Sequence, residues 1–138
     1  MIDEIERTLE LRAPPERVWR AITEPDELAR WFGDSAELRL ETGGEGWLGW
    51  KSHGRFAVRV ELWQPPMRFA WRWGREPDLP LDETPSTLVE WELAPRDDGG
   101  TTLHLRESGF DRPQDREQNV KGWRHELREL EGYVETAG

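Results

Sequence analysis

The stretch from Met67 to Trp73 alternates large apolar side chains with arginine or alanine, and this pattern constrains the fold more than any other feature of the chain. One parity carries Met67, Phe69, Trp71 and Trp73, and the other carries Arg68, Ala70 and Arg72. A period of two places successive side chains on opposite faces of an extended backbone, so the stretch predicts a β-strand with one strongly aromatic face. That face belongs either to an unusually bulky core or to the wall of a cavity.

Further segments show the same two-residue period, which predicts a sheet of about six to seven strands. They span residues 5–11, 36–40, 46–51, 55–63, 86–93 and 101–110. Short turn signals such as Gly43-Gly44 and the Asp-Asp-Gly-Gly sequence at 97–100 join them, so we expect an antiparallel sheet. In the segment 55–63 the core parity ends at Leu62, which places Trp63 on the outer face.

Three segments have the signals of helices. Pro15 and Pro25 each stand where a short helix begins, because a first-turn N–H needs no partner. From about 114 to 136 apolar residues recur every three or four positions, which predicts one long helix with an apolar stripe. The stripe consists of Val120, Trp123, Leu127, Leu130 and Val134. Gly122 within it costs about 1 kcal/mol relative to alanine, and we expect it to permit close approach of a neighbouring element.

An antiparallel sheet needs one face covered, and the C-terminal helix is the only predicted element long enough to cover it. We therefore predict an α+β fold in which a curved antiparallel sheet wraps a long C-terminal helix, with two short helices after the first strand. The 138 residues are most simply one domain, 1–138. Leu, Ile, Val and Phe number only 28 of these residues, but nine tryptophans supply the missing core, because each aromatic side chain buries about 150–250 Å².

The composition excludes several classes of function. A formal charge of −10 without a basic run argues against binding to nucleic acid or to an anionic membrane. The absence of cysteine excludes disulfides, thiolate catalysis and cysteine-ligated metals. The acidic first ten residues lack the apolar core of a signal peptide, and no apolar run reaches membrane-spanning length. We therefore expect a cytoplasmic protein without a cofactor or a bound metal.

Four segments in collinear order carry a family resemblance: residues 13–33, 62–73, 99–110 and 122–134. Together they resemble the START-like helix-grip (SRPBCC) superfamily, and within it the branch related to the C-terminal domain of the Hsp90 ATPase activator Aha1. The resemblance implies the helix-grip fold, with a cavity between the concave face of the sheet and the long helix. Members bind hydrophobic small molecules, act as polyketide cyclases or engage a chaperone, and they share no catalytic set that could be carried over. The segments 44–54 and 74–85 depart from the family pattern, and both would lie near the mouth of such a cavity.

The candidate ligand-binding residues are aromatic or charged side chains on the inward parity of their elements. They are Arg7, Trp31, Phe32, Trp71, Trp73, Trp91, Glu107, Phe110 and Trp123. Each aromatic residue taken singly is compatible with plain core, but pockets are lined mainly by apolar and aromatic groups, and flat indoles fill a tight interior poorly. The set as a whole therefore favours a cavity.

Arg7 and Glu107 are charged residues on otherwise apolar parities. An ionised side chain in a dry interior is costly unless it is paired or hydrated. The two side chains therefore pair, face a hydrated cavity, or lie at strand ends in solvent. If they reach one cavity, they would orient the polar end of a ligand; a catalytic acid–base role for Glu107 has only the hint of burial behind it.

Other features of the sequence say less about function. His53, His104 and His125 are not spaced as metal ligands. Acidic residues on the outer parities predict a solvated sheet face, which is open to the alternative of a basic partner. Trp50 and Trp63, if exposed, favour self-association into a homodimer.

The sequence thus predicts a domain that binds a hydrophobic or amphipathic small molecule in a tryptophan-lined cavity. Two alternatives stay open: a co-chaperone or other protein-interaction domain that resembles the Hsp90 activator, and a polyketide cyclase-like enzyme.

Overall fold

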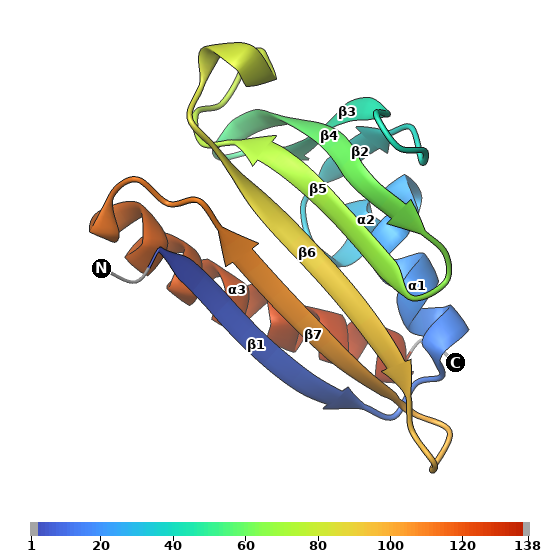
Figure 1. Ribbon diagram of the computed structural model, residues 1–138. Coiled ribbons are helices and arrows are strands. Elements are labelled where there is room, and N and C mark those ends of the chain that lie inside the picture. The colour runs from blue at the N-terminus through green and yellow to red at the C-terminus, as the bar shows by residue number, and fades with distance from the viewer. Residues whose placement is uncertain (1–2, 137–138) are drawn as a thin grey trace.

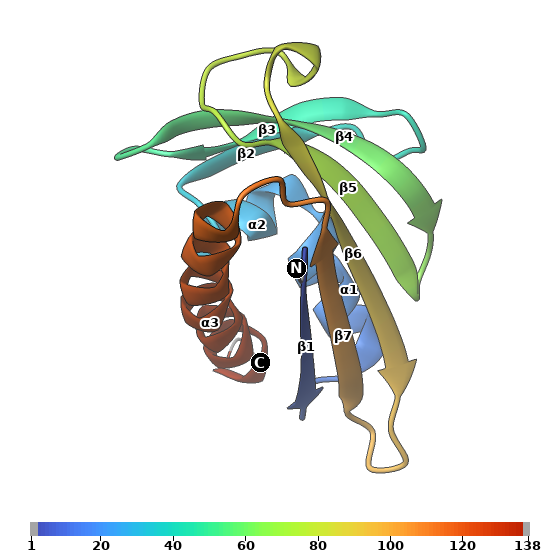
Figure 2. The same ribbon diagram turned by 60° about the vertical axis from the view of Figure 1, so that its left-hand side comes forward.

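The computed structural model describes residues 3–136, in which one curved sheet wraps a long helix (Figures 1 and 2). The order of elements is β1 (Glu4–Leu11), α1 (Pro15–Thr23), α2 (Pro25–Trp31), β2 (Ser35–Leu38), β3 (Glu45–Trp50), β4 (Gly54–Gln64), β5 (Arg68–Gly74), the 3₁₀ turn η1 (Leu81–Glu83), β6 (Ser86–Pro95), β7 (Thr101–Ser108) and α3 (Pro113–Thr136). This is the predicted α+β helix-grip architecture. The seven strands are confirmed, as are the two short helices after the first of them and the long C-terminal helix.

All neighbouring strands pair antiparallel, in the order β1-β7-β6-β5-β4-β3-β2. Strands β2 to β7 follow one another as a meander, and β1 closes the sheet by pairing with the last strand, β7. Figure 2 shows the sheet curling so that β2, β3 and β4 pass over one end of α3 while β1 and β7 run beside it. The site described below lies at that end.

The apolar stripe of α3 closes the interior. Trp123, Leu127, Leu130 and Val134 are all buried, at intervals of three or four residues that place them on one face of the helix. Opposite them, residues of β5, β6 and β7 are buried, among them Phe69 and Trp71 with no exposed surface. The inward-facing residues of the strands and the apolar stripe of α3 therefore pack against each other in a single core.

The structure corrects one prediction for β4, the outward position of Trp63. The pairing of β4 with β5 shifts register between Val60 and Leu62, so one extra residue reverses the parity beyond that point. As a result Trp63 pairs with Phe69 and packs at 5.4 Å from the ring centroid of Trp19. The indole that was expected to be exposed is therefore partly buried against Trp19 and Phe69.

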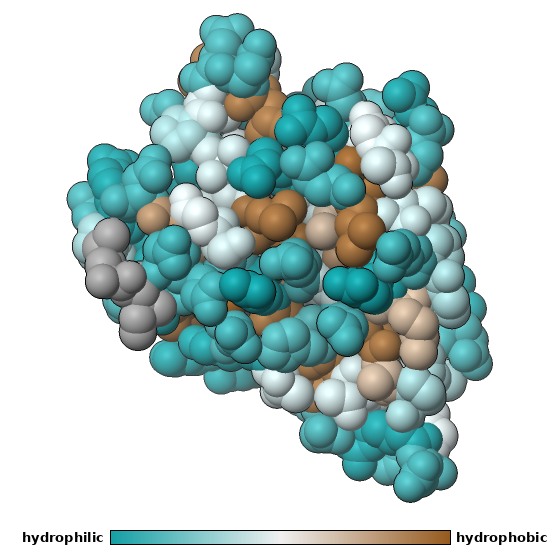
Figure 3. All heavy atoms as spheres, in the orientation of Figure 1, coloured by the Kyte–Doolittle hydropathy of each residue, from teal (hydrophilic) through white to brown (hydrophobic). Residues whose placement is uncertain are grey.

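The outer face of the sheet carries mainly hydrophilic side chains, and hydrophobic atoms appear there only in separate small areas (Figure 3). Acidic residues alternate with arginines across the strands: Arg106 contacts Glu4, Arg96 contacts Glu10, and Arg72 contacts Glu61. Exposed pairs of this kind contribute about 0–1 kcal/mol each, so they keep the face solvated and add little to stability.

Replacing Leu130 by alanine is expected to lower the free energy of unfolding by about 2–5 kcal/mol, because the side chain is completely buried and leaves a cavity. The matched control is Leu79→Ala, since Leu79 is 37% exposed and its loss should change stability by about 0.5 kcal/mol or less. Urea denaturation measures both. Equal effects of the two substitutions would contradict the packing described here.

Candidate ligand pocket

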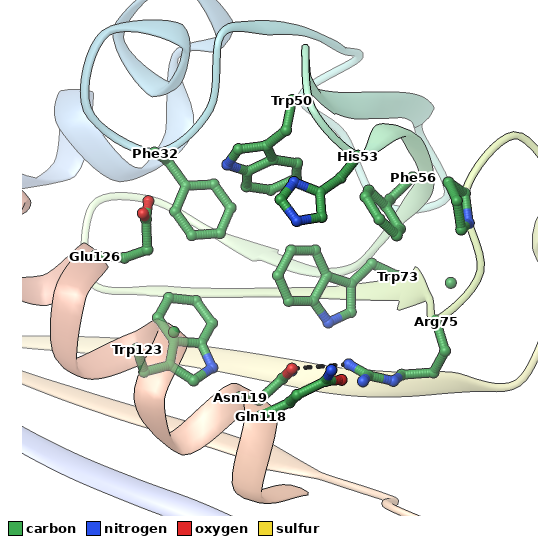
Figure 4. Close-up of a pocket in the computed structure, with 13 residues that line it drawn as sticks. Phe32, Trp50, His53, Phe56, Trp73, Arg75, Gln118, Asn119, Trp123 and Glu126 are labelled. Atoms are coloured by element: carbon green, nitrogen blue, oxygen red, sulfur yellow. Dashed lines mark hydrogen bonds between the residues drawn. The ribbon is translucent and has the colours of Figure 1, made fainter. Parts of the chain in front are cut away.

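A pocket of about 490 Å³ lies where the sheet curls over α3, and we call it the α3 pocket (Figure 4). Its lining consists of Phe32, Trp50, His53, Phe56, Trp73, Gly74, Arg75, Pro77, Gln118, Asn119, Gly122, Trp123 and Glu126. These residues come from the end of α2, from β3 and β4 with the turn between them, from β5 and the loop after it, and from α3. The volume falls within the range of about 300–1,000 Å³ that small-molecule sites occupy.

Five aromatic rings form the walls of the α3 pocket. Phe32 lies nearly parallel to two of them, with a centroid distance of 5.7 Å to Trp73 and of 5.4 Å to Trp123. Trp50 meets Phe32 edge-on at 5.2 Å and Phe56 at 5.7 Å. The rings therefore brace one another into one continuous apolar surface.

Backbone contacts set the position of the wall on the α2 side. Phe32 caps α2, and the chain then turns at Gly33 into β2. A Cβ atom at Gly33 would stand 2.7 Å from the carbonyl oxygen of Gly49, so only glycine lets the end of α2 lie this close to β3. This close approach places Phe32 against Trp50.

Glu107 lies directly behind this wall and is completely buried. Its carboxylate oxygens accept hydrogen bonds from the indole N–H groups of Trp73 (2.8 Å) and Trp123 (2.7 Å). They also accept bonds from the hydroxyl of Thr87 (2.5 Å) and from the amide nitrogen of Asn119 (2.9 and 3.1 Å). The four donors come from β5, β6 and α3, so one side chain of β7 ties three elements to its own strand.

None of the four partners of Glu107 is a cation. Hydrogen bonds from neutral donors replace the hydration of the buried charge, and bonds to a charged group contribute about 1.5–3 kcal/mol each. Both oxygens are occupied by these donors, and Glu107 is not among the residues that line the pocket. The geometry is that of a positioning group for two wall residues, and it leaves no lone pair free for acid–base chemistry with a ligand.

Asn119 connects this buried group to the polar end of the α3 pocket. Its side-chain oxygen accepts a hydrogen bond of 2.9 Å from Arg75, which also lies 3.7 Å from the carboxylate of Asp115. The guanidinium stands over the ring of Phe110 at 5.7 Å. Arg75 is thus held in place by three groups, in the loop where β5 ends.

Glu126 marks the other end of the pocket, two helical turns along α3 from Asn119. Its side chain is 17% exposed, and one of its oxygens is buried without a hydrogen-bond partner among the described residues. The other oxygen lies 3.8 Å from the ring of His125. Burial, together with the smaller effect of the charge of Glu129, raises the pKa of Glu126 to about 8. The carboxyl group turns toward Phe32 across the pocket (Figure 4).

The nine residues that the sequence pointed to fall into three groups. Phe32, Trp73 and Trp123 line the α3 pocket; Glu107 and Phe110 lie behind its lining, in contact with Trp73 and Arg75 respectively; and Trp31, Trp71, Trp91 and Arg7 do not line it. Their role in ligand binding stays a prediction.

Three of these candidates, Trp31, Trp71 and Trp91, are buried in the core and do not line the α3 pocket. Trp71 and Trp91 are at most 1% exposed, and the buried N–H of each has no partner among residues 3–136. Trp31 is buried too, and its N–H bonds the carbonyl of Ala21 at 2.7 Å. All rings on one face of a strand point inward. Their position along the strand decides which of them line the pocket.

Arg7 does not pair with Glu107. Its guanidinium bonds the backbone carbonyl of Glu6 at 2.7 Å. Strand β1 is the edge of the sheet, so the long side chain of Arg7 reaches solvent beside α3 while Glu107 is enclosed one strand inward. The two residues therefore sit in different environments.

Sequence reasoning did not select Trp50, His53, Phe56, Arg75, Gln118, Asn119 and Glu126 as ligand-binding residues. The segments 44–54 and 74–85, which depart from the family pattern, could have pointed to some of these residues, because they supply Trp50, His53, Arg75 and Pro77 to the lining. Asn119 and Glu126 carried no signal, since polar residues on a helix flank usually face solvent. The expectation for Gly122 was wrong: a Cβ atom there would meet nothing within 4 Å, and the missing side chain adds to the space of the pocket.

Two further observations bear on function. Within residues 3–136, histidine, cysteine and acidic side chains form no cluster that could hold a metal ion. None of the helices described has the length and apolar character needed to cross a bilayer.

The wrapped sheet, the long helix and the pocket between them define a domain of the helix-grip class. Residues 12–135 match the family described as Activator of Hsp90 ATPase homolog 1-like protein, and the chain belongs to this family. No curated protein matches the chain significantly.

Three solved structures are similar over almost the whole chain. DynU16, from the dynemicin biosynthetic locus, is 27% identical with a TM-score of 0.83 over 99% of this chain and 49% of DynU16. The Aha1 dimer from Colwellia psychrerythraea is 18% identical (TM-score 0.81; 99% and 98% covered), and PFC0360w, an HSP90 activator from Plasmodium falciparum, is 23% identical (TM-score 0.80; 96% of each covered). The chain thus spans about half the length of DynU16 and nearly all of the other two.

Replacing Glu107 by glutamine should lower the free energy of unfolding by about 2–4 kcal/mol. The amide turns an N–H toward donors that need an acceptor, so buried groups lose their partners. Glu92→Gln is the matched control, because Glu92 is exposed on the outer face of β6 and its change should stay within about 0.5 kcal/mol. Guanidinium denaturation measures both, and a Glu107→Gln variant as stable as the control would contradict the hydrogen-bond geometry.

Glu126 should make stability depend on pH. Its pKa is about 8 in the folded protein against 4.5 for the unperturbed group, so between these values the folded chain binds a proton that the unfolded chain has released. Stability therefore falls as pH rises from about 4.5 to about 8. Glu126→Gln should match the wild type at pH 5 and exceed it in stability at pH 9, as measured by urea denaturation. Parallel pH profiles of the two proteins would refute this assignment.

Proposed function

We propose that this protein binds a hydrophobic or amphipathic small molecule in the α3 pocket. The observation that carries the proposal is the pocket itself: about 490 Å³ walled by five aromatic rings, with a few polar side chains in its lining, namely His53, Arg75, Gln118, Asn119 and Glu126. Ligand sites generally combine an apolar lining with a few placed polar groups in this way. Burial of an apolar ligand would supply most of the affinity, at about 25 cal/mol per Å² removed from water.

Two structural features support a role for the pocket beyond imperfect packing. The orientation of two of its walls is fixed from behind by Glu107, so the space is held open by a built network. Gly122 contributes no side chain where any other residue would narrow the pocket, although glycine costs about 1 kcal/mol in a helix. Both features make the fold less stable than it would be with a filled apolar core.

The first test is a panel of hydrophobic ligands, followed by thermal melting and intrinsic tryptophan fluorescence. Three tryptophans line the pocket, so occupancy should change their emission. A ligand present at 100 times its Kd should add about 2.7 kcal/mol to the free energy of unfolding. If no ligand of the panel shifts either signal, small-molecule binding is excluded for the classes tested.

Gly122→Leu provides the site-specific test. Its new side chain meets no atom at Cβ and enters the pocket, so it should keep the fold and weaken any ligand by at least about tenfold. Gly132→Leu is the matched control in the same helix, since a Cβ there also meets nothing within 4 Å and lies away from the pocket. Affinities measured by calorimetry should separate the two variants; equal affinities would place the ligand elsewhere.

A second candidate is a chaperone contact. Its support is the family description and the similarity to PFC0360w, which is described as an HSP90 activator. Such a role needs an outer surface and leaves the pocket unused. Stimulation of a purified Hsp90 ATPase by the wild type and by Gly122→Leu alike would favour it, and the oligomeric state of this chain would then be measured in the same mixture.

A further inference from the structure

The two ends of the α3 pocket differ in charge, which bears on the class of ligand it holds. At one end Arg75 is already paired with Asn119 and lies near Asp115. At the other end the carboxyl group of Glu126 has one oxygen without any partner. Arg75 is the only arginine or lysine among the lining residues; its Nε is buried without a hydrogen-bond partner among the described residues, but its two terminal nitrogens are directed to Asn119 and Asp115, which makes it a weak site for an acidic ligand.

The space between these ends favours a cation as well. The faces of tryptophan and phenylalanine rings attract positive charge, and tryptophan does so most strongly. Glu107, with four uncharged partners, adds a buried negative charge behind Trp73 and Trp123. The chain as a whole carries a formal charge of −10, which draws cations toward it.

We infer that the α3 pocket takes a ligand with an aromatic body and a basic nitrogen at one end, the nitrogen paired with the carboxylate of Glu126. The inference rests on the proposed function and names the ligand class for the same site. One oxygen of Glu126 is buried while the side chain as a whole is 17% exposed, so the ligand nitrogen would meet the carboxylate from its exposed side. Asn119 and Glu126 stand seven residues apart on α3, which sets a spacing of about 10 Å for the two ends.

The pairing makes binding depend on pH. Glu126 carries a proton below a pKa of about 8 in the free protein, and an ammonium group favours the ionised form. Binding therefore releases a proton, and affinity for an amine falls as pH decreases below 8, by up to about tenfold per unit. A neutral ligand has no such dependence.

Other charged groups face the same carboxyl group. His125 and Glu129 do so from α3; across the α3 pocket the other charged or titratable lining residues are His53, from the turn between β3 and β4, and Arg75, at the opposite end, while the residue that follows α2, Phe32, is uncharged. Protonation of either histidine would also weaken an amine at low pH. A Glu126→Gln variant separates these effects, because any slope that it retains belongs to the histidines.

Three probes of nearly equal shape test the inference by isothermal titration calorimetry: 2-(naphthalen-2-yl)ethylamine, 2-(naphthalen-2-yl)ethanol and 3-(naphthalen-2-yl)propanoic acid. At pH 8.5 the amine should bind at least about tenfold more tightly than the alcohol, and the acid should bind most weakly. Titration at pH 7 in two buffers of different ionisation enthalpy should show the release of close to one proton for the amine only.

In Glu126→Gln the amine should lose its advantage while the alcohol keeps its affinity within about threefold, which also shows that the variant is folded. Equal binding of amine and alcohol to the wild type, or tightest binding of the acid, would overturn the inference and leave the proposed function standing. If none of the three binds and the hydrophobic panel also fails, the proposed function is overturned together with it.

Discussion

The hydrogen bonds to the carboxylate of Glu107 hold together the part of the molecule where the sheet curls over α3. The carboxylate is a charged group with no exposed surface, and it gathers donors from β5, β6 and α3 around one residue of β7. Because an unpaired buried charge is so costly, the four donors must stay in place together. The distance between sheet and helix, and the tilt of two indole rings, follow from that requirement.

That network divides the space between sheet and helix into two regions. On one side of it, Leu127, Leu130 and Val134 fill the interior against the sheet in the ordinary way. On the other side the helix presents Gly122 and Glu126, and the curl of β2 to β4 encloses space that they do not fill. The pocket is therefore a consequence of where along α3 the apolar stripe gives way to small and polar residues.

Much of the architecture could be predicted from periodicity. Alternation along the strands and the three- and four-residue spacing on α3 identify the two faces that must meet, and the proline positions mark the two short helices. The prediction failed at Trp63, because an extra residue between Val60 and Leu62 reverses the parity and no local pattern marks such a bulge. It also failed to separate Trp73 from Trp71, which share a strand face and differ only in what lies opposite them.

The sequence by itself determined which residues face inward, since a strand or helix period is fixed by backbone geometry. It also determined that indoles must form much of the core, because the chain has few aliphatic residues. Only the tertiary structure decided which inward rings border open space, which polar groups meet behind them and which carboxyl group has a buried oxygen without a hydrogen-bond partner. Those outcomes depend on contacts between segments distant in the chain, such as Trp50 with Phe32 or Glu107 with Asn119, and no local pattern encodes the distance between two such segments.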